Sequence, residues 1–78
     1  MIGKAIKYMR KEKKIKQVDL CKIINIGQST LSDYENEKIS IEFSLLEKIA
    51  SICDYDIVFI NRITKEKFKV NQLERKDI

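Results

Sequence analysis

Four polar side chains in the segment GQSTLSDYEN, residues 27–36, have types and a spacing suited to hydrogen-bond recognition. On a helix with about 100° per residue they fall on one side, while Leu31 and Tyr34 fall on the other with Thr30 at their edge. An amide both donates and accepts hydrogen bonds and a carboxylate accepts them, so this surface can match the donors and acceptors of a partner. The four residues are Gln28, Ser29, Ser32 and Asp33.

The chain lacks the residue types that metal centres and most acid–base catalysts need. It contains no histidine, and its two cysteines, Cys21 and Cys53, do not form a CxxC motif. It has no glycine-rich phosphate loop and no paired-carboxylate motif, and its carboxylates are scattered over helix faces. We therefore expect no enzyme activity, no metal and no cofactor, and two reduced cysteines in the core.

Charge is distributed unevenly along the chain, whose net charge is +4. Residues 1–22 carry eight basic and two acidic side chains, residues 23–61 carry two basic and seven acidic, and residues 62–78 carry six basic and three acidic. The polar segment at residues 27–36 holds two acidic residues and no basic one. If the partner is a polyanion, the attraction must come from outside this segment.

The length of 78 residues allows one domain with one modest core. No apolar run approaches the roughly 20 residues that a membrane span needs. The N-terminus MIGKAIKYMR has charges where a signal peptide has its apolar stretch. We expect a cytoplasmic protein with no membrane partner.

Apolar residues at helical spacing predict a helix at about residues 2–13 and two short helices at about residues 17–24 and 28–36. Asn25 and Gly27 tolerate turn and left-handed conformations, so the chain can change direction between the short helices without a proline. The inward positions of the three helices are Ile2, Ala5, Ile6, Met9, Val18, Cys21, Ile24, Leu31 and Tyr34.

A fourth helix is expected to run to about residue 53, with Ser40 as its N-cap. Its apolar stripe consists of Leu45, Leu46, Ile49, Ala50 and Cys53. Together the four stripes make one small helical core, so we expect a mainly α domain over residues 1–54.

The pattern then changes to that of strands in DIVFINRITKEKFKV. Ile57, Val58, Phe59 and Ile60 are followed by a turn near residues 64–66 and by Phe68 and Val70 alternating with lysines. The first strand is apolar on both faces; one face can cover the helical core and a second copy of the chain is the economical cover for the other. We expect a β-hairpin extension and dimerisation element at residues 55–70, and a flexible tail at residues 71–78. The alternatives are a hairpin that packs only within its own chain, and a helix extended through residues 51–61.

Two short helices joined by a tight turn, the second with one polar face, describe a helix-turn-helix in physical terms. The segment QVDLCKIINIGQSTLSDYEN resembles the helix-turn-helix of the phage-repressor and Cro-like (XRE) family, and STLSDYEN is its most specific part. The similarity covers about residues 2–53. It implies a small four-helix domain like that of Cro and C1 repressors, with double-stranded DNA as the partner.

By position, the resemblance implies that the polar face of the third helix enters the major groove. It assigns base contacts to Gln28, Ser29 and Asp33, and places Ser32 and Thr30 near bases or backbone. In our assignment Ser32 reads bases and Thr30 contacts the DNA backbone.

The resemblance also implies supporting roles for residues around that helix. Gln17 matches a glutamine that touches phosphate and buttresses the recognition helix, and Asn36 and Lys38 match the loop that contacts the DNA backbone. Arg10 and Glu35 match a pair that forms a structural salt bridge.

Several residues depart from the family pattern. Cys21 replaces the usual alanine, Asn25 the usual glycine, and Gly27 a serine or threonine that normally caps the recognition helix. Glu37 occupies a common glycine position, and Asp33 replaces a residue that is often arginine or glutamine. Asp33 is the departure that touches function most directly.

An acidic recognition helix is compatible with DNA binding because phosphate contacts supply most sequence-independent affinity and base contacts supply discrimination. Lys16, Lys22 and Lys38, together with helix N-termini, can hold the phosphates. Gln28 can bond adenine through two hydrogen bonds and Asp33 can accept one from cytosine, each good pairing being worth about 1–3 kcal/mol of discrimination.

The sequence therefore predicts a homodimeric, sequence-specific transcriptional regulator, a repressor by family likeness, that binds an inverted-repeat operator. One alternative is an antitoxin that regulates its own operon and has a toxin or other protein partner. The other is a protein-interaction module that keeps the helix-turn-helix shape without DNA affinity, which the acidic middle segment would favour.

Overall fold

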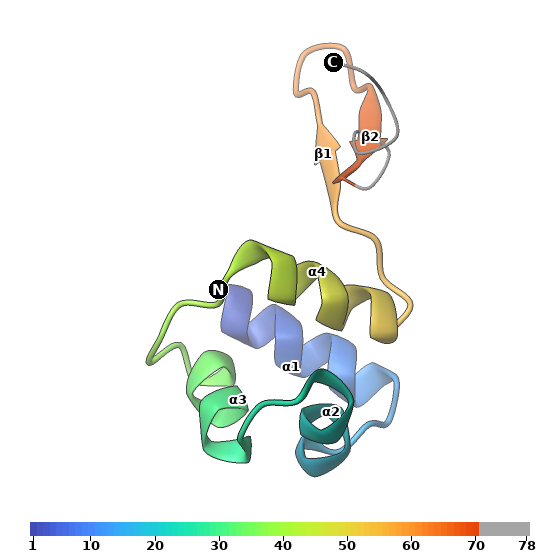
Figure 1. The fold of residues 1–78 in the computed structure, drawn as a ribbon. Helices are drawn as coiled ribbons and strands as arrows, with labels where there is room; N and C mark the ends of the chain where they lie inside the picture. Colours follow the sequence, from blue (N-terminus) through green and yellow to red (C-terminus); the bar gives the residue numbers. More distant parts are fainter. Residues whose placement is uncertain (71–78) are drawn as a thin grey trace.

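The computed structural model describes residues 1–70, so the flexible tail predicted at residues 71–78 lies outside the described residues. Four helices precede a two-stranded antiparallel sheet, which confirms the predicted fold class (Figure 1). The elements are α1 (Ile2–Glu12), α2 (Gln17–Ile24), α3 (Gln28–Glu35), α4 (Phe43–Ile52), β1 (Val58–Ile60) and β2 (Lys67–Lys69).

The four helices enclose one core. Each contributes one fully buried aliphatic side chain, namely Ile6, Leu20, Leu31 and Ile49. Cys21 and Cys53 are buried free thiols in the same core. Burial raises the pKa of both thiols, which favours the uncharged form that an apolar core accommodates.

Some details of the predicted helices were wrong. Three residues expected to point inward, Ile2, Ala5 and Val18, are exposed, Val18 to 42 %, and on α2 Leu20 is fully buried instead. Ser40 was expected to cap the fourth helix, but α4 begins at Phe43 with Glu42 as its N-cap, and no side chain caps it. The segment before α4 is therefore a longer connection than the sequence suggested.

The hairpin has a defined register in which Phe59 pairs with Phe68, Val58 with Lys69 and Ile60 with Lys67. The Phe59 and Phe68 rings stack with their centroids 5.5 Å apart. At the turn, the Asn61 side chain accepts hydrogen bonds from two backbone N–H groups, which closes the loop without a proline.

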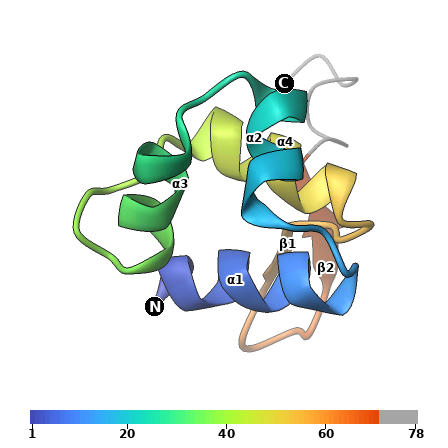
Figure 2. The same cartoon turned by 90° about the horizontal axis from the view of Figure 1, so that it is seen from below.

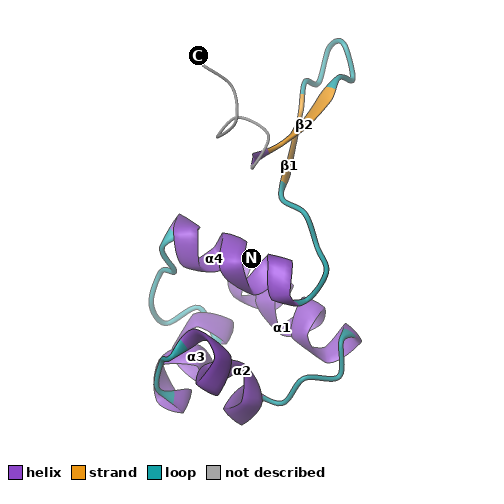
Figure 3. Ribbon diagram, turned by 45° about the vertical axis from the view of Figure 1, so that its right-hand side comes forward, coloured by secondary structure: helices purple, strands orange, loops and turns teal. Residues whose placement is uncertain are grey.

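The hairpin projects from the α4 side of the helical body, while α2 and α3 lie at the opposite end (Figures 1 and 3). Ile57 packs against the core, but all residues of β1 and β2 are exposed in the single chain. Of the predicted first strand only Ile57 therefore covers the helical core; the expectation was wrong for Val58–Ile60, because the linker carries these residues away from the helices. Both faces of the hairpin remain uncovered by the described part of the chain.

Candidate functional site

The turn between α2 and α3 sets the direction of α3, the helix that carries the polar face, relative to α2 (Figure 2). Asn25 ends α2 in the left-handed conformation (φ 58°, ψ 52°), and Ile26 N–H donates to the Cys21 carbonyl at 3.1 Å. Asparagine adopts this conformation more readily than most residues, which explains how it stands in for glycine. Gly27 then begins α3 in an extended conformation (φ −71°) that does not require glycine.

The polar face of α3 is accessible from solvent. Gln28 and Ser29 at its N-terminus are exposed, and Ser32 and Asp33 one turn later are half-buried. Thr30 is half-buried at the edge of this face. The four predicted base-reading side chains thus share one helix and one accessible surface.

The C-terminus of α3 is closed by a local hydrogen-bond pattern. Glu37 N–H donates to the Tyr34 carbonyl at 3.1 Å and Lys38 N–H to the Asp33 carbonyl at 2.9 Å, with Glu37 in the left-handed conformation (φ 60°). The Asn36 amide donates to the Ser32 hydroxyl at 3.3 Å. Lys38, whose side chain is exposed, is therefore held close to the end of the polar face.

A buried ion pair fastens α3 to the rest of the body. Arg10 on α1 donates from Nε to Glu35 Oε2 at 2.7 Å and from Nη2 to Oε1 at 3.0 Å, and the two side chains are 9 % and 2 % exposed. Arg10 Nη1 also donates to the Ile15 carbonyl at 2.9 Å, and Gln17 Nε2 donates to Glu35 Oε1 at 3.0 Å. Glu35 thereby receives bonds from both α1 and α2, so the orientation of α3 is fixed from two sides.

This pair predicts a pH dependence of stability. Burial alone would raise the pKa of the Glu35 carboxyl, but hydrogen bonds from Arg10 and Gln17 and the Arg10 charge hold it below its ordinary value of 4.5. The unfolded chain therefore binds more protons than the folded one just below that value, so the stabilisation is complete above about pH 4.5 and is lost as the pH falls through the lowered pKa. Urea unfolding over this interval should show the loss, and Glu35→Gln should flatten it. An equally steep loss in the variant would contradict the assignment.

Two helix N-termini and three lysines lie on α2, α3 and the residues that flank them. α2 begins after Lys16 and α3 after Gly27, and no side chain caps either N-terminus. Their first N–H groups are therefore available to an anion, which the helix dipole also favours. Lys16, Lys22 and Lys38 are exposed.

Gly3 allows a close approach of α1 to α3 that was not predicted from the sequence. A Cβ atom at this position would collide with the Tyr34 carbonyl oxygen and lie 2.8 Å from that of Glu35. The N-terminal turn of α1 therefore sits directly on the backbone of the last turn of α3. A glycine inside an otherwise regular amphipathic helix was the only signal for this close approach in the sequence.

The predicted site residues separate into two groups in space. Those assigned to DNA lie on α2, α3 and the loop after α3, and those assigned to dimerisation lie at the hairpin end of the molecule. Of the latter, Ile57 is half-buried and Val58, Phe59 and Ile60 are exposed. Within residues 1–70 no helix is long and apolar enough to cross a membrane, and no cluster of side chains suits a metal ion.

Comparison with known proteins identifies the relatives of this chain. The helix-turn-helix family model matches residues 6–60, from the middle of α1 to the end of β1. The chain is 33 % identical to the immunity repressor protein of Bacillus phage phi105 over 81 aligned positions, which cover 99 % of this chain and 56 % of the relative.

A second relative is the antitoxin PezA of Streptococcus pneumoniae serotype 4. It is 30 % identical over 67 residues, which cover 86 % of this chain and 41 % of the relative. The chain therefore spans about half the length of the curated relatives that it matches. No solved structure matches it.

Proposed function

The chain belongs to the helix-turn-helix family of Cro/C1-like DNA-binding regulators, and from that premise we propose how it acts. It is a cytoplasmic, sequence-specific transcriptional repressor that binds an inverted-repeat operator as a homodimer. The polar face of α3 enters the major groove, where Gln28, Ser29, Ser32 and Asp33 contact base edges. Repression follows from covering a promoter.

The observation that carries this proposal is the rigid support of an accessible polar helix. Arg10 on α1 and Gln17 on α2 both donate to the buried carboxylate of Glu35, in the last turn of α3. A base contact discriminates only if its geometry is fixed, and this network fixes α3 relative to α1 and α2.

Contacts to phosphates flank the recognition helix. Five side chains contact the DNA backbone, namely those of Lys16, Gln17, Thr30, Asn36 and Lys38. Gln17 donates one side-chain N–H to Glu35. The amide oxygen and the second N–H of Gln17 take no part in that hydrogen bond. The uncapped N-termini of α2 and α3 add backbone N–H donors for phosphate.

The first test is the affinity for a random-sequence duplex at graded salt concentrations, measured by fluorescence anisotropy. Binding that weakens linearly in log salt would support phosphate contacts. Failure to bind any duplex even at low salt would overturn DNA binding and favour the protein-interaction module, which the acidic middle segment supports.

Asp33→Ala and Lys38→Ala form a matched pair that separates base reading from phosphate binding. Asp33→Ala should change the preferred base at one half-site position by about 1–3 kcal/mol and leave non-specific affinity nearly unchanged. Lys38→Ala should weaken binding to all sequences and reduce the salt slope by about one unit. The measurement is anisotropy with a panel of single-base operator variants. Equal loss on all sequences in Asp33→Ala would contradict its base-reading role.

The homodimer is proposed from the uncovered hairpin. Phe59 and Phe68 are 51 % and 41 % exposed in the single chain. Large apolar side chains gathered on one exposed surface usually mark an interface. Sedimentation of a monomer at micromolar concentration would remove this part of the proposal.

The similarity to an antitoxin supports a second candidate function, in which the chain regulates its own operon and binds a toxin. The test is co-expression with the product of the neighbouring gene. A neighbouring product that arrests growth alone, and is neutralised and co-purified with this chain, would favour this function. A neighbour without either property would leave the stand-alone repressor.

A further inference from the structure

The backbone of the hairpin has two outer edges. Within residues 1–70 the sheet consists of β1 and β2 alone. Val70 N–H donates to the Ile57 carbonyl at 3.0 Å and Asn61 N–H to that of Glu66 at 2.8 Å, so the odd-numbered positions of β1 turn their backbone groups toward β2. Because this direction alternates along a strand, the N–H and C=O groups of Val58 and Ile60 point to the outer edge of β1.

The two edges differ in charge. By the same alternation, Lys67 and Lys69 form the outer edge of β2, and a two-fold pairing of β2 with itself would set lysine against lysine. Val58 and Ile60 on β1 carry no charge and are 40 % and 55 % exposed. An uncharged apolar edge without proline is prone to pair with another strand, whereas edge lysines oppose it.

We infer that β1 pairs antiparallel with β1 of a second copy of this chain, centred on Phe59, to form a continuous four-stranded sheet. The inference rests on the proposed homodimer and specifies its interface. In this register Val58 of one copy exchanges two backbone hydrogen bonds with Ile60 of the other, and the two-fold axis repeats the exchange. Phe59 then lies opposite Phe59 of the second copy.

Charge complementarity selects this register. Counting outward from Phe59 brings Asp56 of one copy to the turn that follows β1 of the other, at the position of Arg62, and the symmetry repeats this approach. A register centred on Val58 sets Asp56 against Ile60 of the second copy, and one centred on Ile60 carries it past Arg62 toward Thr64, so both lose the match. Among the three registers that use the outward-facing groups of β1, the one centred on Phe59 therefore brings an acidic and a basic residue together.

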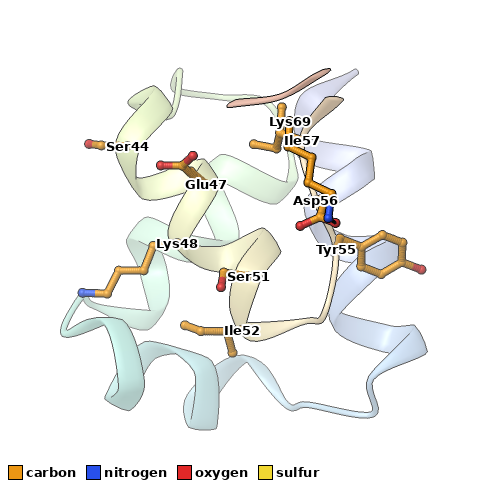
Figure 4. A pocket seen from close by; sticks show the side chains of 9 residues that line it. All are labelled: Ser44, Glu47, Lys48, Ser51, Ile52, Tyr55, Asp56, Ile57 and Lys69. Carbon is orange, nitrogen blue, oxygen red and sulfur yellow. Dashed lines mark ion pairs between the residues drawn. The ribbon is translucent and has the colours of Figure 1, made fainter. Parts of the chain in front are cut away.

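The foot of the hairpin is hollowed on the side that faces α4. A groove of about 350 Å³ lies between α4 and the start of the hairpin, where Asp56 Oδ2 pairs with Lys69 Nζ at 3.2 Å (Figure 4). Asp56 lines this groove, so the inferred register brings Arg62 and the turn of the second copy to its rim.

The same pairing extends the stacked aromatic pair. Phe59 and Phe68 lie on one face of the hairpin, as their stacked rings require. Joining two hairpins at β1 sets four phenylalanines in a row across the sheet, in the order Phe68, Phe59, Phe59, Phe68. Each Phe59 ring thereby gains an aromatic neighbour on the side that is open in the single chain.

Single cysteine substitutions test whether β1 is the paired edge and which residue lies at the centre of the pairing. In a two-fold antiparallel pairing, only the residue on the symmetry axis lies opposite the same residue of the second copy. Four variants of the chain are oxidised mildly, namely Val58→Cys, Phe59→Cys, Ile60→Cys and Phe68→Cys. They are compared with the unsubstituted chain, whose Cys21 and Cys53 are buried. Phe59→Cys should give the fastest disulfide-linked dimer. Phe68→Cys is the matched control, because it removes the other ring of the same stack but lies on β2. It should give little disulfide-linked dimer.

Each other outcome overturns part of the inference. Fastest cross-linking at Val58→Cys or Ile60→Cys would overturn the register, and fastest cross-linking at Phe68→Cys would overturn the choice of β1. Absence of a specific cross-linked dimer at all four positions would overturn the pairing.

A charge exchange provides a test that leaves the aromatic rings intact. Asp56→Arg or Arg62→Asp alone should weaken dimerisation about tenfold in sedimentation, since each sets like charges opposite one another twice. The double exchange should restore most of the loss. Lys65→Asp makes the same charge change in the same turn but away from Asp56 of the second copy, and it should have a smaller effect. A double variant no tighter than the single ones would contradict the pairing.

These experiments use no DNA, so they fail independently of the proposed repressor function. A chain that cross-links at Phe59→Cys but selects no DNA sequence would keep this interface and lose the proposed function. A chain that selects an inverted repeat but does not cross-link there would keep the function and lose this interface.

Discussion

Arg10→Ala should lower the free energy of unfolding by about 3–5 kcal/mol, because it leaves the Glu35 carboxylate buried without its cation. A domain of this size is stabilised by roughly 4–12 kcal/mol in total. The variant should therefore be partly unfolded at or near 37 °C. Its DNA binding should decrease in proportion to the fraction of folded protein. Urea unfolding followed by circular dichroism at neutral pH measures the change.

Two variants make this result specific to the ion pair. Lys11→Ala removes a charge from an exposed position one residue away on α1 and should change stability by less than about 0.5 kcal/mol. Arg10→Met combined with Glu35→Leu removes both charges and should recover most of the loss, since an apolar pair of similar volume is often neutral. A loss below about 1 kcal/mol in Arg10→Ala would contradict the role assigned to the pair.

Gly3→Ala should destabilise the protein by about 1–3 kcal/mol, although the same substitution inside a helix is normally stabilising. The added Cβ would collide with the backbone carbonyl of Tyr34, which cannot rotate away as a side chain could. α1 must then shift relative to α3, so DNA affinity should fall as well. Thermal and urea unfolding measure the first effect and anisotropy the second.

Gly27→Ala is the matched control for this substitution. A Cβ there would lie 3.8 Å from the nearest atom, the Thr30 hydroxyl oxygen, which is an ordinary contact. Its effect should be limited to the change of N-cap residue, below about 1 kcal/mol. A Gly3→Ala variant as stable as the parent chain would show that α1 and α3 can separate without loss.

Local patterns were sufficient to predict most of the elements. The helix predicted at residues 17–24 matches α2, and the hairpin follows from the change of apolar period and from the Phe68–Val70 alternation. The polar face of α3 could be located because the polar and apolar residues of this helix separate cleanly at helical spacing. These signals depend on neighbours a few residues apart, which a sequence displays directly.

Other features depended on contacts between distant segments. Val18 has a helical apolar spacing, but whether it meets the core depends on how α2 packs, and Leu20 takes that place. Gly3 is explained only by a carbonyl more than thirty residues away, and the projecting hairpin only by the path of the linker after α4. Ser40 has good capping chemistry, but helix formation begins later in the chain.

If α3 reads DNA bases from a symmetric dimer, selection from a random duplex pool followed by sequencing should recover a symmetric site. We predict an enriched inverted repeat whose half-site centres lie about 34 Å, one helical turn, apart. The same selection with Asp33→Ala should enrich a repeat altered at one position of each half-site. A pool that stays random with the folded parent chain would contradict the claim.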